Sequence, residues 1–120
     1  MAGQNDGKRE RLAAFQRLHD PRDFQRVYAA QKALHARDVV MFMAPNGLTF
    51  ARLGVSVGCK HGNAVRRNRI KRVLRAAFRQ SRELLPAGFD YVLVPRKGVA
   101  EYNTQAVRET LARLAKKVCS

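Results

Sequence analysis

The sequence contains little of what most catalytic or metal-binding sites are made from. Of its 120 residues only two are cysteines and three are histidines, and the nine acidic residues are scattered without a DxD or ExxE pattern. Cys59 and Cys119 lie far apart, with no CxxC or Cys/His spacing that would indicate a zinc site. We therefore expect two free thiols in a reducing compartment and no metal site in the polypeptide.

Long apolar runs are also missing. No run approaches the 18 or more residues that indicate a membrane-spanning helix. The first residues, MAGQNDGKRERLAAF, lack the apolar core of a secretory signal. We therefore expect a cytoplasmic protein that does not associate with a membrane.

Negative charge is scarce compared with positive charge. The chain has 24 Lys and Arg against 9 Asp and Glu, which gives a formal net charge of +15 at pH 7. Such a surplus destabilises a compact fold by self-repulsion unless a polyanion neutralises it, and nucleic acid is the polyanion that we expect.

The length of the chain fits one domain. We predict a flexible basic arm over residues 1–11, which are polar and charged, and a single folded domain over residues 12–120.

A first helix is predicted after residue 20. Asp20 has the residue type of an N-cap, and Pro21 suits the first helical position. The spacing i, i+3, i+4, i+7 predicts one face that contains Phe24, Val27, Tyr28 and Gln31.

The rest of the chain alternates strands and helices. Residues 37–44 are rich in β-branched and aromatic residues, and residues 48–57 alternate, with Leu53, Val55 and Val57 on one side. The turn sequence PNG lies between the two segments, so we predict that they pair as a β-hairpin. A helix is expected over residues 64–81, a third strand over 89–94 and a last helix over 104–118. The order α-β-β-α-β-α predicts an α+β fold, a two-layer sandwich with helices packed on a small sheet.

The helix at residues 64–81 has an unusual concentration of positive charge and contains no acid. Asn63 is its expected N-cap, and arginine, which suits bidentate contacts to phosphate, predominates over lysine. Its apolar side is expected to contain Ile70, Val73, Leu74 and Ala77. Its opposite stripe contains Asn68, Arg72, Arg75 and Arg79, flanked by Arg69 and Lys71. This pattern predicts polyanion binding.

Charge alone leaves the kind of nucleic acid open. The basic helix follows a strand rather than a short partner helix, so the helix-turn-helix pattern of DNA-binding proteins is missing. RNA-binding proteins usually add exposed aromatic side chains for stacking on unpaired bases. Candidates are Phe24 and Tyr28 on the first helix, and Phe42 or Phe50 in the strands; core packing is the alternative role for each.

Four segments, in order, resemble the bacterial ribonuclease P protein family. GNAVRRNRIKRVLRAAFR resembles the family signature, in which an Arg-Asn-Arg core sits on a basic helix. The segments RL…DFQRVY and RLGVSVGCKHG upstream and DYVLVPRKG downstream agree as well, over about residues 17–118. The chain departs from common family residues at Gly58-Cys59, His61 and Pro95.

The resemblance implies an accessory subunit of a ribonucleoprotein endonuclease that removes the 5′ leader of precursor tRNA. The catalytic centre would belong to a large RNA, which would also hold most of the Mg²⁺. The protein would have no catalytic residue, no cofactor of its own and no obligatory protein partner. Its fold would be similar to that of a domain of a ribosomal protein, with a left-handed β-α-β crossover that runs against the usual rule.

The resemblance also implies two sets of binding residues. The set expected to bind the catalytic RNA is Asn63, Arg66, Arg67, Asn68, Arg69, Lys71, Arg72 and Arg75. The set expected in a cleft for the leader, between the first helix and the sheet, is Arg17, Phe24, Tyr28, Phe42, Arg52 and Lys60.

The polypeptide carries no motif for cleaving RNA unaided. A protein-only ribonuclease would need a His pair with a lysine, or a carboxylate cluster that holds metal ions, whereas His19, His35 and His61 fall in three separate segments. The alternative function is a structural RNA-binding protein such as a ribosomal component, because that class would also be a basic α+β domain. Stimulation of precursor tRNA maturation separates the two.

Overall fold

The computed structural model describes residues 16–97, 99 and 101–119. The predicted N-terminal arm, residues 1–11, lies outside the described residues. Among the described residues, no helix combines the length and the apolar character that crossing a bilayer requires.

Helix α2, Pro21–Ala29, begins where the sequence predicts. Asp20 is its N-cap and accepts a hydrogen bond from the Arg22 backbone N–H at 2.9 Å, and Pro21 takes the first helical position. The prediction that Gln31 extends the helical face is wrong, because Gln31 adopts a positive φ of 58° in the turn after the helix. That turn sends the chain directly into the sheet.

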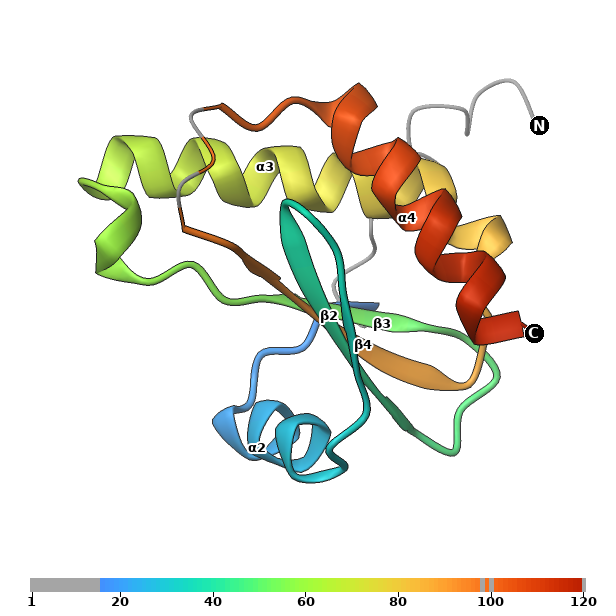
Figure 1. The fold of residues 1–120 in the computed structure, drawn as a ribbon. Coiled ribbons are helices and arrows are strands. Elements are labelled where there is room, and N and C mark those ends of the chain that lie inside the picture. Colours follow the sequence, from blue (N-terminus) through green and yellow to red (C-terminus); the bar gives the residue numbers. More distant parts are fainter. Residues whose placement is uncertain (1–15, 98, 100, 120) are drawn as a thin grey trace, which may run out of the picture.

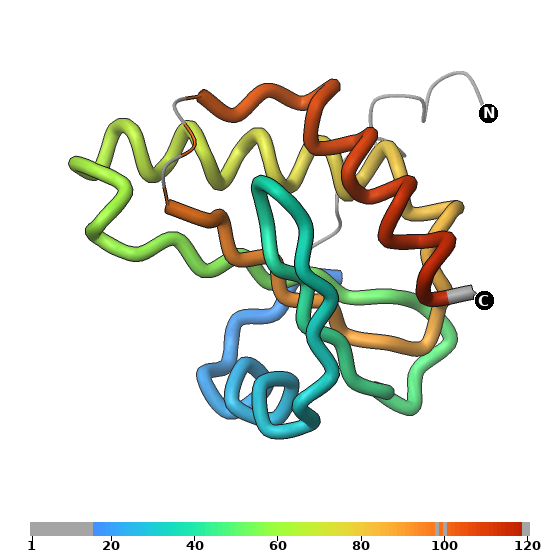
Figure 2. The backbone as a smooth tube through the Cα atoms, viewed as in Figure 1, coloured from blue at the N-terminus to red at the C-terminus, as the bar shows by residue number. Residues whose placement is uncertain are grey.

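The sheet has four strands, in the order β1-β2-β4-β3. They are β1 (Ala33–His35), β2 (Val39–Pro45), β3 (Arg52–Val55) and β4 (Phe89–Pro95). Strand β2 pairs antiparallel with β1 and with β4, whereas β3 pairs parallel with β4. Figure 2 shows the chain leaving β3, running through α3 and returning to β4, which is the parallel β-α-β unit of the expected fold.

The predicted hairpin between residues 37–44 and 48–57, which correspond to β2 and β3, is wrong. Strand β4 lies between β2 and β3, and the hairpin that does form joins β2 to the short strand β1, which the sequence pattern did not reveal. The physical reason is the burial of β4 on both faces. Tyr91 and Leu93 pack into one core and Val92 into another, so this strand is most stable at the centre of the sheet.

The long helices cover one face of the sheet, and α2 lies against the other (Figure 1). They are α3 (Ala64–Ser81) and α4 (Thr104–Cys119), and both match the predicted helices to within one residue. Two 3-10 turns, Cys59–His61 and Arg82–Leu84, flank α3. The predicted α+β class, helices packed on a small sheet, is confirmed.

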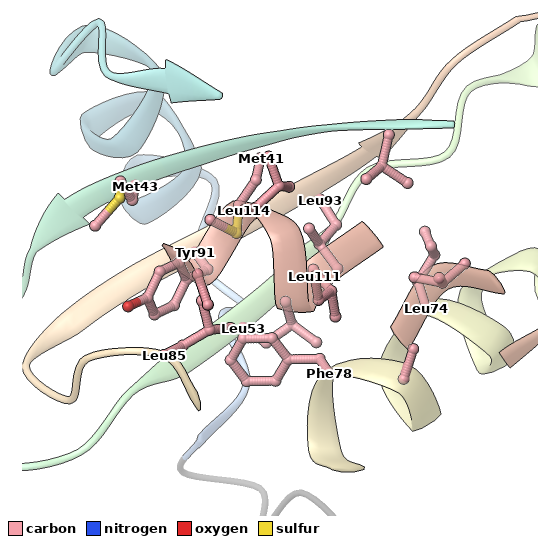
Figure 3. Packing of buried hydrophobic residues seen from close by; sticks show 14 of the residues in the cluster. Met41, Met43, Leu53, Leu74, Phe78, Leu85, Tyr91, Leu93, Leu111 and Leu114 are labelled. Atoms are coloured by element: carbon pink, nitrogen blue, oxygen red, sulfur yellow. The ribbon is translucent and has the colours of Figure 1, made fainter. Parts of the chain in front are cut away.

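The main hydrophobic core lies between the sheet and the two long helices (Figure 3). Phe78 of α3 and Tyr91 of β4 are fully buried and pack with their ring centroids 5.6 Å apart. The apolar face of α4 supplies Val107, Leu111, Leu114 and Ala115, as its spacing predicts. A smaller cluster on the opposite face holds α2 to the sheet. The two faces therefore present different surfaces to solvent.

Candidate nucleic-acid interface

The N-terminus of α3 is built by a glycine and an asparagine. Gly62 has a φ of 115°, a conformation that strains any residue with a Cβ, and it turns the chain into the helix. Asn63 then caps the helix, since its Oδ1 accepts from the Arg66 backbone N–H at 3.0 Å. The Arg67 side chain folds back, and its Nε donates to the Gly62 carbonyl at 3.2 Å.

Helix α3 has one buried face and one cationic face. Its buried residues include Ile70, Leu74 and Ala77, and Val73 is half-buried against the same core, as predicted. Side chains of the predicted stripe lie on the remaining surface: Asn68, Arg69 and Arg72 are exposed, and Lys71, Arg75 and Arg79 are partly exposed. The structure therefore brings the predicted polyanion-binding residues of α3 together on one side.

The cations of this stripe are not neutralised within the part of the chain that the structure describes. The ion pairs there involve the carboxylates of Asp20, Asp23 and Asp90 and lie on the α2 side of the sheet. None of them includes a residue of the stripe, Arg69, Lys71, Arg72, Arg75 and Arg79. Among the described residues, therefore, no ion pair offsets the repulsion between cations one helical turn apart.

The opposite face of the sheet carries the predicted aromatic residues. Phe24 and Tyr28 of α2 and Phe42 of β2 pack, partly buried, around the cluster formed by Leu18, Val27, Ala44 and Val92. Tyr28 meets Phe42 edge-on, with ring centroids 4.9 Å apart and an interplanar angle of 89°. The three rings thus form one surface between α2 and the sheet, and each keeps some area accessible to solvent.

Gly54 is required where α2 crosses β3. A Cβ at this position would lie 2.6 Å from Cζ of Phe24 and 3.2 Å from Cβ of Leu18. The absence of a side chain therefore allows the Phe24 ring to lie directly on the strand backbone.

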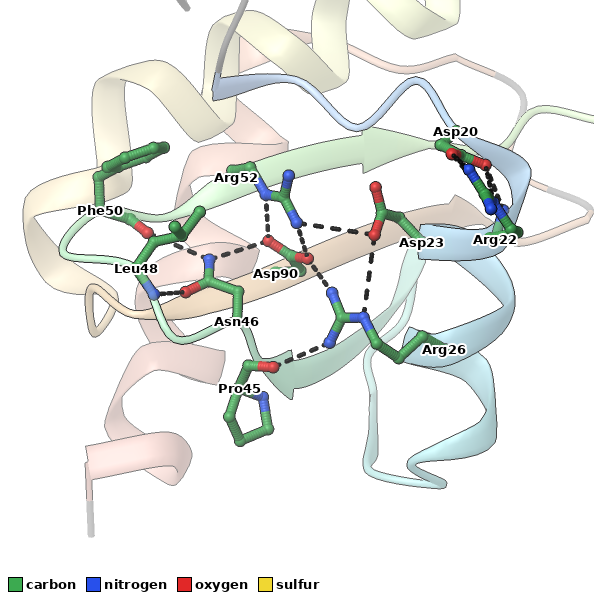
Figure 4. Close-up of polar contacts among 10 residues, drawn as sticks. All are labelled: Asp20, Arg22, Asp23, Arg26, Pro45, Asn46, Leu48, Phe50, Arg52 and Asp90. Atoms are coloured by element: carbon green, nitrogen blue, oxygen red, sulfur yellow. Dashed lines mark hydrogen bonds and ion pairs between the residues drawn. The ribbon is translucent and has the colours of Figure 1, made fainter.

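Arg52 has a partner that the sequence did not suggest. Its guanidinium forms two hydrogen bonds to the fully buried carboxylate of Asp90, Nε to Oδ1 at 2.8 Å and Nη2 to Oδ2 at 2.7 Å (Figure 4). Arg26 of α2 also bonds Asp90, and Asn46 donates to Oδ1 at 2.9 Å. Arg52 therefore helps to hold α2 on the sheet through Asp90 and Asp23. These carboxylates neutralise its charge, so it is not an unpaired cation in the cleft.

The environment of Asp90 keeps it ionised. Burial alone would raise the pKa of this carboxyl group, but the hydrogen bonds from Arg52 and Asn46 and the charges of Arg52 and Arg26 outweigh it and lower the pKa. The same interaction raises the pKa of Arg52. A buried acid in a mainly apolar strand, FDYVLVP, was the only sequence signal for this network.

The remaining predicted leader-cleft residues lie in two places. Lys60 is exposed in the turn before α3, and it lines a hollow of about 430 Å³ with residues that include Lys97 and Val94. Val94 also packs against the aromatic cluster, so this hollow continues the aromatic face. Arg17 forms a β-bridge with Leu53 and so lies beside β3, at the edge of the sheet. Burial lowers the pKa of Arg75 of α3, and the charge of Arg17 adds to this effect.

Comparison with known proteins assigns the family. A family model described as Ribonuclease P matches residues 12–119. The ribonuclease P protein component of Thermotoga petrophila is 39% identical over 107 residues, which cover 86% of this chain and 92% of that protein. That of Caldanaerobacter subterraneus subsp. tengcongensis is 39% identical over 109 residues, which cover 91% of each chain.

Solved structures agree with the sequence comparison. The ribonuclease P protein of Thermotoga maritima superposes with a TM-score of 0.76 at 37% identity, over 84% of this chain and 96% of that one. The protein of Staphylococcus aureus gives a TM-score of 0.74 at 31% identity, over 86% of this chain and 94% of that one. Since sequence and fold agree over most of both chains, this protein belongs to the ribonuclease P protein family.

Proposed function

We propose that the protein assists ribonuclease P through two surfaces on opposite faces of its sheet. As the protein component of this ribonucleoprotein endoribonuclease, it acts with a catalytic RNA on precursor tRNA. The cationic stripe of α3 binds the catalytic RNA, and the aromatic face between α2 and the sheet binds the single-stranded 5′ leader. Lys60, at the hollow that continues this face, adds a phosphate contact at its end.

The observation that carries the proposal is that the cationic stripe of α3 and the aromatic rings under α2 lie on opposite sides of the sheet. The α3 stripe offers guanidinium groups that form no ion pair with a carboxylate in the described part of the chain, which suits the backbone of a folded RNA. The α2 face offers the rings of Phe24, Tyr28 and Phe42, which suit unpaired bases. A leader is single-stranded and the catalytic RNA is folded, so each surface fits one partner.

The role that we propose for the protein in the reaction is electrostatic. Packing precursor tRNA against a large RNA concentrates negative charge, and a protein with a net charge of +15 screens the resulting repulsion. The catalytic RNA holds most of the Mg²⁺, and the protein raises substrate affinity and eases Mg²⁺ occupancy without touching the scissile bond. Among the described residues, no group of three or more His, Cys, Asp or Glu side chains is arranged to hold a metal ion.

The test is reconstitution with a bacterial ribonuclease P RNA at low Mg²⁺. Wild-type protein should stimulate 5′ maturation of a precursor tRNA, and the stimulation should fall steeply with salt because each phosphate contact releases counterions. The double variant Arg69→Ala with Arg72→Ala should weaken assembly with the RNA. Tyr28→Ala should instead weaken binding of leader-containing tRNA relative to mature tRNA.

Three results would contradict the proposal. A protein effect that does not change with salt would exclude the electrostatic role. Equal losses for precursor and mature tRNA with Tyr28→Ala would assign that ring to the core alone. No stimulation, with tight binding to ribosomal RNA, would favour the structural RNA-binding alternative.

A further inference from the structure

The hydroxyl group of one tyrosine fastens the chain where it leaves β4. Tyr102, in the segment before α4, donates to the Arg96 carbonyl at 2.6 Å and, over a longer distance, to the Asp38 carbonyl at 3.3 Å. Its ring is half-buried against the main core. Burial and the charge of Asp38 raise the pKa of Tyr102 to about 12, so the hydroxyl keeps its proton and remains a donor at neutral pH.

The acceptors of this hydroxyl are themselves held in place. Arg96 N–H donates to the Asp38 carbonyl at 2.9 Å, which continues the pairing of β2 with β4 by one residue. Thr110 of α4 is buried, and its Oγ1 donates to Oδ1 of Asp38 at 2.9 Å. The hydroxyl of Tyr102 therefore belongs to a network that joins the turn before β2, the end of β4 and α4.

The Arg96 carbonyl influences where Lys97 lies. The oxygen of Arg96 and the nitrogen and Cα of Lys97 belong to one planar peptide unit, so a bond that holds the oxygen also sets the direction in which the chain enters Lys97. Lys97 is exposed and lines the hollow of about 430 Å³ that Lys60 also lines. Tyr102 is therefore able to fix the position of Lys97 through the residue between them in the network, Arg96.

We propose that Tyr102 is a positioning residue for leader binding, whose hydroxyl holds the peptide between Arg96 and Lys97 so that Lys97 lies at the hollow with Lys60. The two ammonium groups then contact the phosphates of the leader. The inference rests on the proposed function, in which this hollow continues the leader-binding face. A backbone that is ordered before the leader arrives lowers the entropy cost of binding.

An effect through α3 is the alternative that the experiment must separate. Arg66 of α3, which is expected to bind the catalytic RNA, also acts on Tyr102 through its charge. A tyrosine that acted through Arg66 would alter the affinity for the catalytic RNA, whereas one that acts through Lys97 alters the affinity for the leader. A comparison of precursor with mature tRNA isolates the second effect, because mature tRNA has no leader.

The test uses holoenzyme reconstituted from ribonuclease P RNA and full-length protein, as wild type, Tyr102→Phe, Lys97→Gln and the double variant. Leader preference is measured as the ratio of the affinities for precursor and mature tRNA. Lys97→Gln should lower it on the order of tenfold, as loss of a charged hydrogen bond predicts, and should reduce the salt slope of precursor binding by about one. Tyr102→Phe, which removes only the hydroxyl, should lower it about three- to fivefold, because the lost bond joins neutral groups.

The double variant decides whether Tyr102 acts through Lys97. Its leader preference should equal that of Lys97→Gln alone, because the hydroxyl would then position a side chain that has no charge. Losses that multiply in the double variant would overturn the proposal. Unchanged leader preference in Tyr102→Phe, or a loss of affinity for the catalytic RNA in its place, would overturn it as well.

Tyr91→Phe is the matched control. The hydroxyl of Tyr91 donates to the Pro86 carbonyl at 2.7 Å, near the opposite end of β4. Its removal should also lower the free energy of unfolding but leave leader preference at the wild-type value. Equal losses of leader preference in both phenylalanine variants would assign the effect to stability and refute the positioning role. Failure of the wild type to prefer leader-containing tRNA would instead refute the proposed function, so the two failures are distinguishable.

Discussion

Gly54 lies directly against the Phe24 ring in the proposed leader-binding face. The ring occupies the space in which any larger residue at position 54 would place its Cβ, 2.6 Å from ring atom Cζ. The shape of this face therefore depends on the absence of one methyl group in the neighbouring strand. Sequence reasoning identified Phe24, but a glycine within a strand gave no indication of which residue it approached.

Gly54→Ala should displace the Phe24 ring and destabilise the protein. Overpacking a close contact typically costs about 1–3 kcal/mol, and the loss is measured as the change in the free energy of unfolding in urea. The variant should also bind leader-containing tRNA less tightly relative to mature tRNA. Gly58→Ala is the matched control for the loss of stability, because a Cβ there would have nothing within 4 Å. Wild-type stability and leader preference in Gly54→Ala would refute the contact.

At the scale of elements, Asp90 determines how α2 sits on the sheet. Its carboxylate joins Arg26 of α2 to Arg52 of β3 and Asn46 of the loop after β2. Asp23 of α2 extends the network, with Oδ1 3.7 Å from Nη2 of Arg52. These bonds fix the spacing between the helix and the strands that form the aromatic face.

Asp90→Asn should destabilise the protein by roughly 3 kcal/mol at neutral pH, because two arginines lose their buried counter-charge. The pKa of Asp90 is lowered in the folded state, so its contribution is full above the ordinary carboxyl pKa of about 4 and is lost as pH falls through the folded value. The difference between variant and wild type should therefore shrink on acidification below about pH 4. Urea unfolding over a pH series measures it.

Glu101→Gln provides the control for this pH series, since Glu101 is exposed. Hydrogen exchange of α2 gives a second readout, because a helix that has lost its attachment to the sheet opens more often. A stability difference between Asp90→Asn and wild type that stays constant with pH would show that the charge of Asp90 does not hold α2.

Element prediction succeeded where local chemistry decides and failed where pairing is non-local. Asp20 and Asn63 mark their helix starts because a cap depends only on neighbouring residues. The alternation in residues 48–57 indicated a strand but carried no information about its partner, so β3 was assigned to β2 rather than to β4. The three-residue strand β1 is too short for a recognisable pattern. The same holds for the candidate site. Helix periodicity predicted which residues of α3 share the cationic face, whereas the partnership of Arg52 with Asp90, which is distant in sequence, was not predicted.

At the scale of the whole molecule, the charge surplus should make stability depend on salt. With a net charge of +15, the free protein folds against its own repulsion, which monovalent salt screens. The thermal midpoint should rise by a few °C between low and moderate NaCl, the shift expected for about 0.5–1 kcal/mol in a domain of this size. Calorimetry of the free protein measures it.

The variant Arg69→Gln with Arg72→Gln serves as the comparison for the salt series. Removing two cations that form no ion pair with any described residue should raise the midpoint at low salt and reduce its salt dependence. A midpoint that falls with salt in both proteins would mean that attractive ion pairs, such as those around Asp90, outweigh the repulsion.

The central place of β4 also bears on how the chain folds during synthesis. When the ribosome has made residues up to 88, the segments of β2 and β3 have been synthesised, but β4, which lies between them in the sheet, has not. Closing the sheet waits for residues 89–95, so the contacts that complete it join segments far apart in the chain. Until then β2 and β3 present open edges that can pair with other chains. The positive charge of the nascent chain also favours binding to the ribosomal RNA beside which it is made. Until β4 has been synthesised, the chain is therefore exposed both to this non-specific binding and to strand pairing with other chains.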